Sequence, residues 1–148
     1  MHKILFVCHG NICRSPMAEF IMKYLTKDRN DFLIESKATS FEEVGSDMYS
    51  LAKKVLQEHK IPYEMRKAQR ITDSDYDKYD LIIVMDEQNL YNAKRILGSD
   101  TKNKIKKLLY FMNSNKDIDD PWYTRDFNKC YQEIFDGCQA LLDYIDKK

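Results

Sequence analysis

Hydrophobic runs alternate with amphipathic stripes along the chain. Three runs of consecutive apolar residues, at 4–7, 32–34 and 81–85, are typical of strands that are buried on both faces. The run at 108–112 has the same character and predicts a fourth strand. Residues 68–71 predict a shorter extended piece.

Apolar residues recur at helical spacing between these runs. The stripes predict helices at about 17–25, 46–59, 86–97 and 126–145. Ser15 suits the N-cap of the first helix and Pro16 its first helical position, while Gly98 suits the end of the third. The stretch 113–125 has no such stripe and predicts a polar loop.

Strands that alternate with helices predict an α/β fold, in which a parallel sheet is covered by helices on both faces. No repeat, linker or low-complexity tract divides residues 1–148, so we expect a single domain. Ligands in such folds bind beyond the carboxyl ends of the strands. The loop after the first strand is therefore the first place to look for function.

Composition excludes several classes of protein. Lys and Arg total 24, as do Asp and Glu, so the chain lacks the basic excess of a nucleic-acid-binding protein. No apolar run approaches the roughly 20 residues of a membrane span, and the apolar start is too short for a signal peptide. Four cysteines indicate free thiols rather than a disulfide framework. We expect a cytoplasmic protein that binds neither nucleic acid nor membranes.

The loop from Cys8 to Ser15 has the composition of an anion site. A loop that closes onto a helix N-terminus directs several backbone N–H groups at a common centre. Gly10 permits backbone angles that are closed to other residues, and Asn11 tolerates left-handed geometry. Arg14 offers a planar fork that matches phosphate oxygens.

Cys8 stands at the base of this loop, where a positive field favours the thiolate. A thiolate beneath a phosphate cradle is a nucleophile aimed at phosphorus, and the Ser15 hydroxyl could donate to it or cap the helix. Two alternatives exist: Cys8 is a small core residue, or Cys8 and Cys13 bind zinc. The zinc site lacks a second pair of Cys or His at suitable spacing.

The sequence resembles the low-molecular-weight protein tyrosine phosphatases in segments spread over nearly the whole chain. The matching segments are 8–19, Ser36, 38–40, 80–90 and Asp120–Pro121. The resemblance implies a three-layer α/β domain with a four-stranded parallel sheet and a phosphate-binding loop (P-loop) after the first strand. It also implies a two-step hydrolysis of phosphomonoesters that needs no metal and no cofactor.

The resemblance also implies a role for each residue of the motif. Cys8 is similar to the nucleophile, Arg14 to the phosphate clamp and Asp120 to the general acid. Asn11 is similar to the residue that holds the loop in shape, and Ser15 to the donor that steadies the thiolate.

Cys13 is similar to the family's second loop cysteine, which forms a reversible disulfide with the nucleophile under oxidation. The alternative is that Cys13 is only a packed apolar residue of the loop.

Asp120 supplies what thiolate attack needs, which is a proton for the departing oxygen. Pro121 biases Asp120 towards an extended backbone, which could hold the carboxyl group out towards the pocket. Asp119 is a conceivable substitute without that constraint. Because Cys8 must be deprotonated while Asp120 is protonated, we expect a mildly acidic optimum.

Aromatic side chains are candidates for the pocket walls. Trp122 and Tyr123 follow the predicted acid, and their faces could flank a phenyl ring. Phe41 and Glu42 lie in the segment that resembles the family's other wall, where many relatives have an aromatic residue at the place of Glu42. These aromatic residues could instead belong to the core.

The remaining loop positions bear on the substrate. A bulky Ile12 favours a flat aryl ring, whereas some bacterial relatives with Thr at this place prefer phosphoarginine. His9 is expected at the pocket mouth. Arg66 or Lys67 falls where many relatives place a histidine that bonds towards the loop. Asp86 is either a partner of the loop or an ordinary helix-start carboxylate.

We therefore expect a monomeric phosphatase that acts on phosphotyrosine-containing proteins and on aryl phosphates, and that binds phosphate or other oxyanions as product or inhibitor. The rivals are a thiol-coupled arsenate reductase, a phosphate-binding module without catalysis, and a nucleotide-binding protein. The arsenate reductase needs a relay of further thiols, but no cysteine lies between Cys13 and Cys130. The nucleotide-binding protein would need a Walker motif that is missing.

Overall fold

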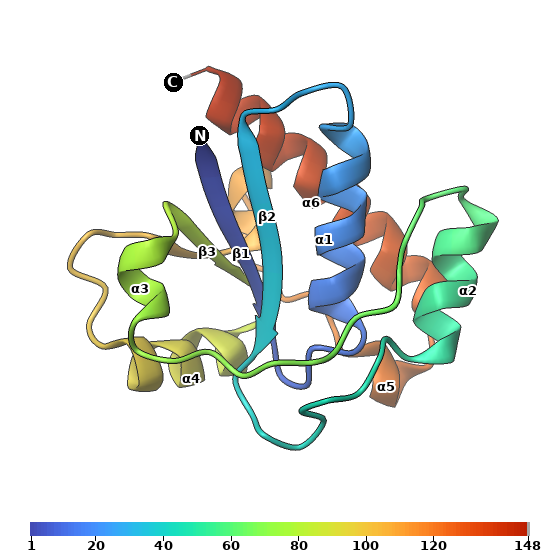
Figure 1. The fold of residues 1–148 in the computed structure, drawn as a ribbon, viewed down its shortest axis with the longest axis horizontal. Coiled ribbons are helices and arrows are strands. Elements are labelled where there is room, and N and C mark those ends of the chain that lie inside the picture. The colour runs from blue at the N-terminus through green and yellow to red at the C-terminus, as the bar shows by residue number, and fades with distance from the viewer. Residues whose placement is uncertain (148) are drawn as a thin grey trace.

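Four parallel strands form the centre of the molecule, and the computed structural model describes residues 1–147 (Figure 1). The strands are β1 (His2–Cys8), β2 (Phe32–Ala38), β3 (Leu81–Val84) and β4 (Ile105–Lys107). Their order in the sheet is β2-β1-β3-β4, so β1 is paired on both sides. Lys148, the last residue of the expected domain, lies outside the described residues.

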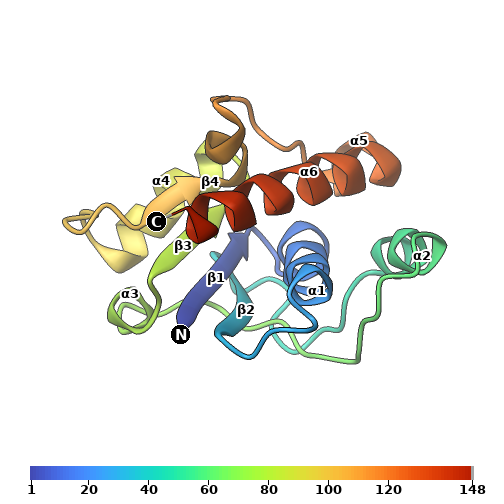
Figure 2. The same cartoon turned by 90° about the horizontal axis from the view of Figure 1, so that it is seen from above.

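The helices cover both faces of this sheet. They are α1 (Arg14–Leu25), α2 (Ser50–Glu58), α3 (Asp75–Lys78), α4 (Glu87–Leu97), α5 (Pro121–Thr124) and α6 (Phe127–Asp146), with a 3₁₀ helix η1 at Leu108–Met112. Figure 2 shows α1 and α6 on one side of the sheet and α3 and α4 on the other. The predicted α/β fold with a four-stranded parallel sheet between two layers of helices is confirmed.

The alternation of side chains along β1 divides the core in two. Ile4 and Phe6 pack into the larger cluster, which α1 and α6 complete. Leu5 and Val7 point to the opposite face and pack into the smaller cluster beneath α4. Both faces of β1 are therefore buried, which is why its sequence is a continuous apolar run.

The predicted fourth strand is wrong in position. The apolar run 108–112 forms η1, and the strand is the preceding segment Ile105–Lys107. The strand was not predicted at 105–107 because it contains Lys107, and charged side chains rarely point into a core. Its side chain is buried and its ammonium group lies 2.9 Å from Glu87 and 3.0 Å from Asp117, and these acids raise the pKa of Lys107 against the opposing effect of burial.

Several predicted boundaries also shift. The first helix begins at Arg14 with Cys13 at its N-cap, so Ser15 is not the cap that the sequence suggested. The second helix begins at Ser50 rather than near residue 46. Segment 68–71 contributes one bridge, between Ala38 and Arg70. The short helices α3 and α5 were not expected, and α5 lies inside the predicted loop 113–125.

Candidate active site

The loop between β1 and α1 surrounds the sulfur atom of Cys8. The Ser15 backbone N–H donates to Sγ over 3.4 Å, and Oγ of Ser15 lies 3.1 Å from Sγ. The Asn11 side chain donates to that same oxygen over 2.8 Å. The neutral Cys8 thiol donates to Ser15 Oγ over the 3.1 Å that separates them, and the Ser15 hydroxyl is placed to donate to the sulfur once the thiol is ionised. The Ser15 hydroxyl group therefore lies beside the Cys8 thiol and does not cap the helix.

Asn11 fixes the shape of this loop. It is fully buried and has a left-handed backbone with φ 59°, as its residue type allows. Its amide nitrogen also donates to Ser36 Oγ over 3.0 Å, and its oxygen accepts from the Gln69 N–H over 3.2 Å and from Arg66. Arg66, not Lys67, therefore reaches the loop from the segment where the sequence left both possible.

Arg14 is held by two groups from distant parts of the chain. Its Nη1 donates to Asp86 over 2.7 Å and to the Ile118 carbonyl oxygen over 2.8 Å. The side chain is only 2% exposed. Burial lowers the pKa of Arg14, but the charges of Cys8, Asp86 and Asp120, together with the Asp86 hydrogen bond, outweigh it and raise the pKa. The guanidinium group stays cationic at every physiological pH.

Asp86 fills both roles that the sequence left open. Its Oδ2 accepts from Arg14, while its Oδ1 accepts from the Asn89 N–H over 2.7 Å and caps α4. One carboxylate therefore ties the start of α4 to the start of α1.

Asp120 lies on the other side of Arg14. Its Oδ2 is 3.5 Å from Nη2 of Arg14, and its Oδ1 accepts from the Trp122 N–H over 3.0 Å at the N-cap of α5. The Ile118 N–H donates to the Met85 carbonyl oxygen over 2.9 Å and anchors the segment that carries Asp120. Asp119 is exposed and points to Lys129, 4.0 Å away.

A cavity of about 180 Å³ opens above Cys8. It is lined by Cys8, His9, Gly10, Ile12, Cys13, Arg14, Glu42, Glu43, Asp120, Trp122 and Tyr123. Asn11 and Ser15 lie behind the lining as supports. Phe41 does not line this cavity; it is 71% exposed, and its ring lies 4.3 Å from the Arg70 guanidinium carbon.

Sequence reasoning missed Glu43, which joins the lining, and Arg125, which bonds to Trp122. Glu42, which the sequence placed in a pocket wall, lines the cavity and pairs with His9 over 3.0 Å. Arg125 donates to the Tyr49 hydroxyl over 2.9 Å and to the Trp122 carbonyl oxygen over 3.2 Å, which ties α5 to the start of α2. No local motif marks Arg125, because its partners are set by the fold.

All four cysteines are free and buried. Burial, followed by the negative charge of Cys8, raises the pKa of Cys13 far above its usual range, so Cys13 is a neutral thiol at neutral pH. Cys130 and Cys138 lie on the buried face of α6. Within residues 1–147, no group of three or more His, Cys, Asp or Glu side chains is placed to hold a metal ion, and no helix is long and apolar enough to cross a membrane.

Comparison with known proteins decides the family. The model of the low molecular weight phosphotyrosine protein phosphatases matches residues 3–148. The chain belongs to this family. The family is named for the removal of phosphate from phosphotyrosine, so the cavity above Cys8 lies in a protein of the tyrosine-phosphatase class.

Individual relatives of this phosphatase cover almost its full length. The low molecular weight protein-tyrosine-phosphatase PtpA of Staphylococcus aureus is 38% identical over 150 residues, which cover 99% of this chain and 96% of the relative. Among solved structures, the low molecular weight protein tyrosine phosphatase of Streptococcus pyogenes has a TM-score of 0.87 at 39% identity, covering 97% of this chain and 93% of its own. YfkJ from Bacillus subtilis has a TM-score of 0.94 at 33% identity, covering 99% and 96%.

Proposed function

We propose that this phosphatase hydrolyses phosphotyrosine in proteins, and small aryl phosphates, through a phosphocysteine intermediate on Cys8 without a metal ion. The observation that carries the proposal is one cavity that holds the Cys8 sulfur, the Arg14 guanidinium group and the Asp120 carboxyl group. These groups are a nucleophile, an anion clamp and a proton carrier, which together suffice for displacement at phosphorus.

In the first step the Cys8 thiolate attacks phosphorus. A sulfur–phosphorus bond forms while the bond from phosphorus to the phenolic oxygen breaks, and the Asp120 carboxylic acid gives its proton to that oxygen. Arg14 and the backbone N–H groups of the loop hold the phosphoryl oxygens, where negative charge develops. The buried ion pair of Arg14 with Asp86 keeps the guanidinium group aligned for this role.

In the second step water attacks the phosphocysteine. The Asp120 carboxylate takes a proton from the water, the sulfur–phosphorus bond breaks, and phosphate leaves. The Ser15 hydroxyl and N–H then stabilise the returning thiolate from the contacts they already make with Sγ. Phosphate, the second product, competes with the substrate in this scheme and inhibits the enzyme.

The cavity favours an aryl ring over a small alkyl group. Ile12 narrows the cavity, and Trp122 and Tyr123 supply apolar walls. Trp122 is braced by Tyr49, whose ring centroid is 4.8 Å away in an edge-to-face contact. In this proposal the enzyme acts as a cytoplasmic monomer on phosphotyrosyl proteins, at a mildly acidic optimum.

The test is phosphate release from a phosphotyrosyl peptide and from p-nitrophenyl phosphate by the wild-type chain and by Cys8→Ser. The serine variant keeps the size and burial of the side chain but is a far weaker nucleophile at neutral pH. We expect turnover of both substrates by the wild type and none by the variant. Full activity of Cys8→Ser, or thiol-dependent arsenate reduction in place of phosphate release, would overturn the proposal.

A further inference from the structure

A second and larger cavity lies directly beside the catalytic one. Its volume is about 620 Å³, and His9 lines both cavities. Thr39, on its inner wall, donates its backbone N–H to the Cys8 carbonyl oxygen over 3.0 Å, and Ser40 donates to the His9 carbonyl oxygen over 3.1 Å. The wall of the second cavity is therefore bonded to the loop that surrounds the Cys8 sulfur.

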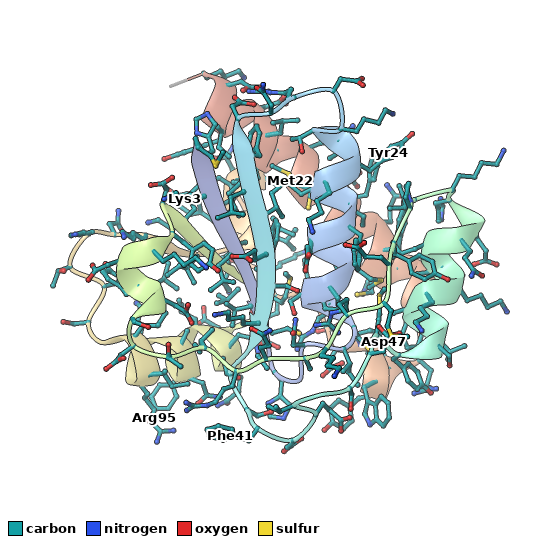
Figure 3. All side chains as sticks on the ribbon, in the orientation of Figure 1. Lys3, Met22, Tyr24, Phe41, Asp47 and Arg95 are labelled. Carbon is teal, nitrogen blue, oxygen red and sulfur yellow. The ribbon has the colours of Figure 1, made fainter. Side chains whose placement is uncertain are left out.

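The charge of this cavity is mainly positive. Arg70 and Arg95 line it, and Asp73 is the acidic side chain among the described lining residues. Within residues 1–147, no carboxylate oxygen lies within 4.0 Å of either guanidinium group. Their charges are therefore not paired, even though acidic and basic residues are equal in number over the chain. In Figure 3, Arg95 and Phe41 lie at the same edge of the molecule, beyond the C-terminal end of β2.

The two guanidinium groups are partly free to bind a ligand. Arg70 spends two of its N–H donors on the carbonyl oxygens of Thr39 and Ile71, each over 3.3 Å, and its face packs on Phe41. The Arg95 guanidinium carbon lies 5.8 Å from the centroid of the Tyr91 ring, and within residues 1–147 the guanidinium group has no hydrogen bond or ion pair. Guanidinium forks without a carboxylate partner are suited to carboxylate or phosphoryl oxygens.

The inner wall also has an unsatisfied polar group. Thr39 is only 6% exposed, and its Oγ1 has no hydrogen-bond partner within residues 1–147. This oxygen has almost no accessible surface, so a rotation of the Thr39 side chain is needed to present it to a ligand in the cavity. Asn92, on the same helix as Arg95, adds an amide to the lining of the cavity.

We propose that this cavity binds an anionic side chain of the substrate protein, close in sequence to the phosphotyrosine whose phosphate enters the catalytic cavity. The inference rests on the proposed function. An extended peptide advances about 3.3–3.6 Å per residue. With the phosphotyrosine in the catalytic cavity, a residue one to three positions away can therefore pass His9, which lines both cavities, and place its side chain in the second cavity. The anion is a carboxylate of Asp or Glu, or the phosphoryl group of a second phosphorylated residue.

The experiment compares three phosphotyrosyl peptides that differ only in the residues flanking the phosphotyrosine, which are Gln, Glu or phosphoserine. The kcat/KM of each is measured at fixed ionic strength for the wild type, Arg95→Gln and Arg70→Gln. We expect the wild type to prefer an anionic peptide by about fivefold or more, the effect of roughly 1 kcal/mol from a charge pair. Each variant should lose most of that preference, and the better of the two anionic peptides identifies the kind of anion.

Lys94→Gln is the matched control, because it removes the same charge from the neighbouring position of α4 but lies outside the cavity lining. It should keep the preference. All variants should turn over p-nitrophenyl phosphate at the wild-type rate, since that substrate fills the catalytic cavity alone. Equal kcat/KM for the three peptides with the wild type, or equal loss in Lys94→Gln and Arg95→Gln, would overturn the inference. Failure to dephosphorylate any peptide would instead overturn the proposed function.

Discussion

The two carboxylates beside Arg14 differ in how they are held. Its guanidinium group contacts two carboxylates, Asp86 over 2.7 Å and Asp120 over 3.5 Å. Asp86 is bound on both oxygens, by Arg14 and by the Asn89 N–H, so it is suited to a fixed position. Asp120 accepts a hydrogen bond from the Trp122 N–H over 3.0 Å and lines the cavity, as the proton carrier of the proposed mechanism must.

Replacing Asp120 tests this difference. Asp120→Asn keeps the N-cap oxygen of α5 but cannot give up a proton, so kcat for a phosphotyrosyl peptide should fall by about 10²–10⁴-fold. Steady-state kinetics measure the loss. Asp119→Asn is the control, because Asp119 is exposed and paired only loosely with Lys129. A similar loss in the control, or an unchanged rate in Asp120→Asn, would move the acid elsewhere.

The sequence predicted the residues of the site where their chemistry is local. The motif from Cys8 to Ser15 is contiguous in sequence, whereas Asp120 was predicted from the family resemblance, with Pro121 favouring it over Asp119. The sequence could not choose between Arg66 and Lys67, because that choice depends on how segment 60–70 reaches Asn11. Phe41 was expected in the pocket wall, but a neighbouring cation, Arg70, holds it outside the catalytic cavity.

At the scale of elements, α6 packs closely on η1 through a glycine. An added methyl group at Gly137 would come within 2.6 Å of the Leu108 side chain, which is fully buried. At position 137, therefore, α6 lies too close to η1 for a residue that has a Cβ atom, unless Leu108 moves. This contact also gives the apolar run 108–112 its role, since η1 packs on α6 instead of joining the sheet.

The variant Gly137→Ala should destabilise the protein in spite of the higher helix propensity of alanine, which is worth about 1 kcal/mol. Forcing Leu108 aside costs roughly 1–3 kcal/mol, so we expect a net loss in the free energy of unfolding. Denaturation by urea measures it. Gln139→Ala is the control: it lies on the exposed face of the same helix and should change little. A gain in stability for Gly137→Ala would show that the contact is looser than described.

The same scale explains the error at the fourth strand. Sequence patterning identified the three strands that contain a run of consecutive apolar residues, but β4 reads Ile-Lys-Lys. The buried lysine is stabilised there by Glu87, Asp117 and the Asn115 carbonyl oxygen, all of which lie outside β4. Contacts between residues that are far apart in sequence leave no local pattern. The strand was therefore predicted at the neighbouring apolar run instead.

At the scale of the whole molecule, the sheet order brings distant segments to one edge. With β1 in the middle, its loop lies between the segments that follow β2 and β3. Thr39 and Ser40 follow β2, Asp86 follows β3, and each bonds to the loop or to Arg14. Both the catalytic cavity and the second cavity open at this edge, which is why one peptide can reach both.

Stability of the whole fold at acid pH should depend on Asp100. Burial raises the pKa of this carboxyl group, but hydrogen bonds from Tyr76 and from the backbone N–H groups of Ile105 and Lys104 outweigh it and lower the pKa. Because the folded pKa lies below the unfolded one, the ionised group stabilises the fold above the unfolded pKa of about 4. This stabilisation is lost as the pH falls through the folded pKa.

Asp100→Asn should therefore lower the free energy of unfolding by about 1–3 kcal/mol at pH 7, the range for weakened hydrogen bonds at a partly buried group. The difference from wild type should shrink as the pH falls below about 4. Urea denaturation over a pH series measures both. Asp77→Asn, at an exposed residue 3.7 Å from Lys102, should match the wild type throughout. A difference for Asp100→Asn that stays constant down to pH 2 would contradict the account.

The most direct test of the central claim is to trap the covalent intermediate. Wild-type enzyme is mixed with an aryl phosphate, quenched within milliseconds and digested, and the mass of the peptide that carries Cys8 is measured. We predict the addition of one phosphoryl group to Cys8, with no such addition in Cys8→Ser. Release of the phenol with phosphate bound to another residue, or with no phosphorylated peptide at any quench time, would contradict the account.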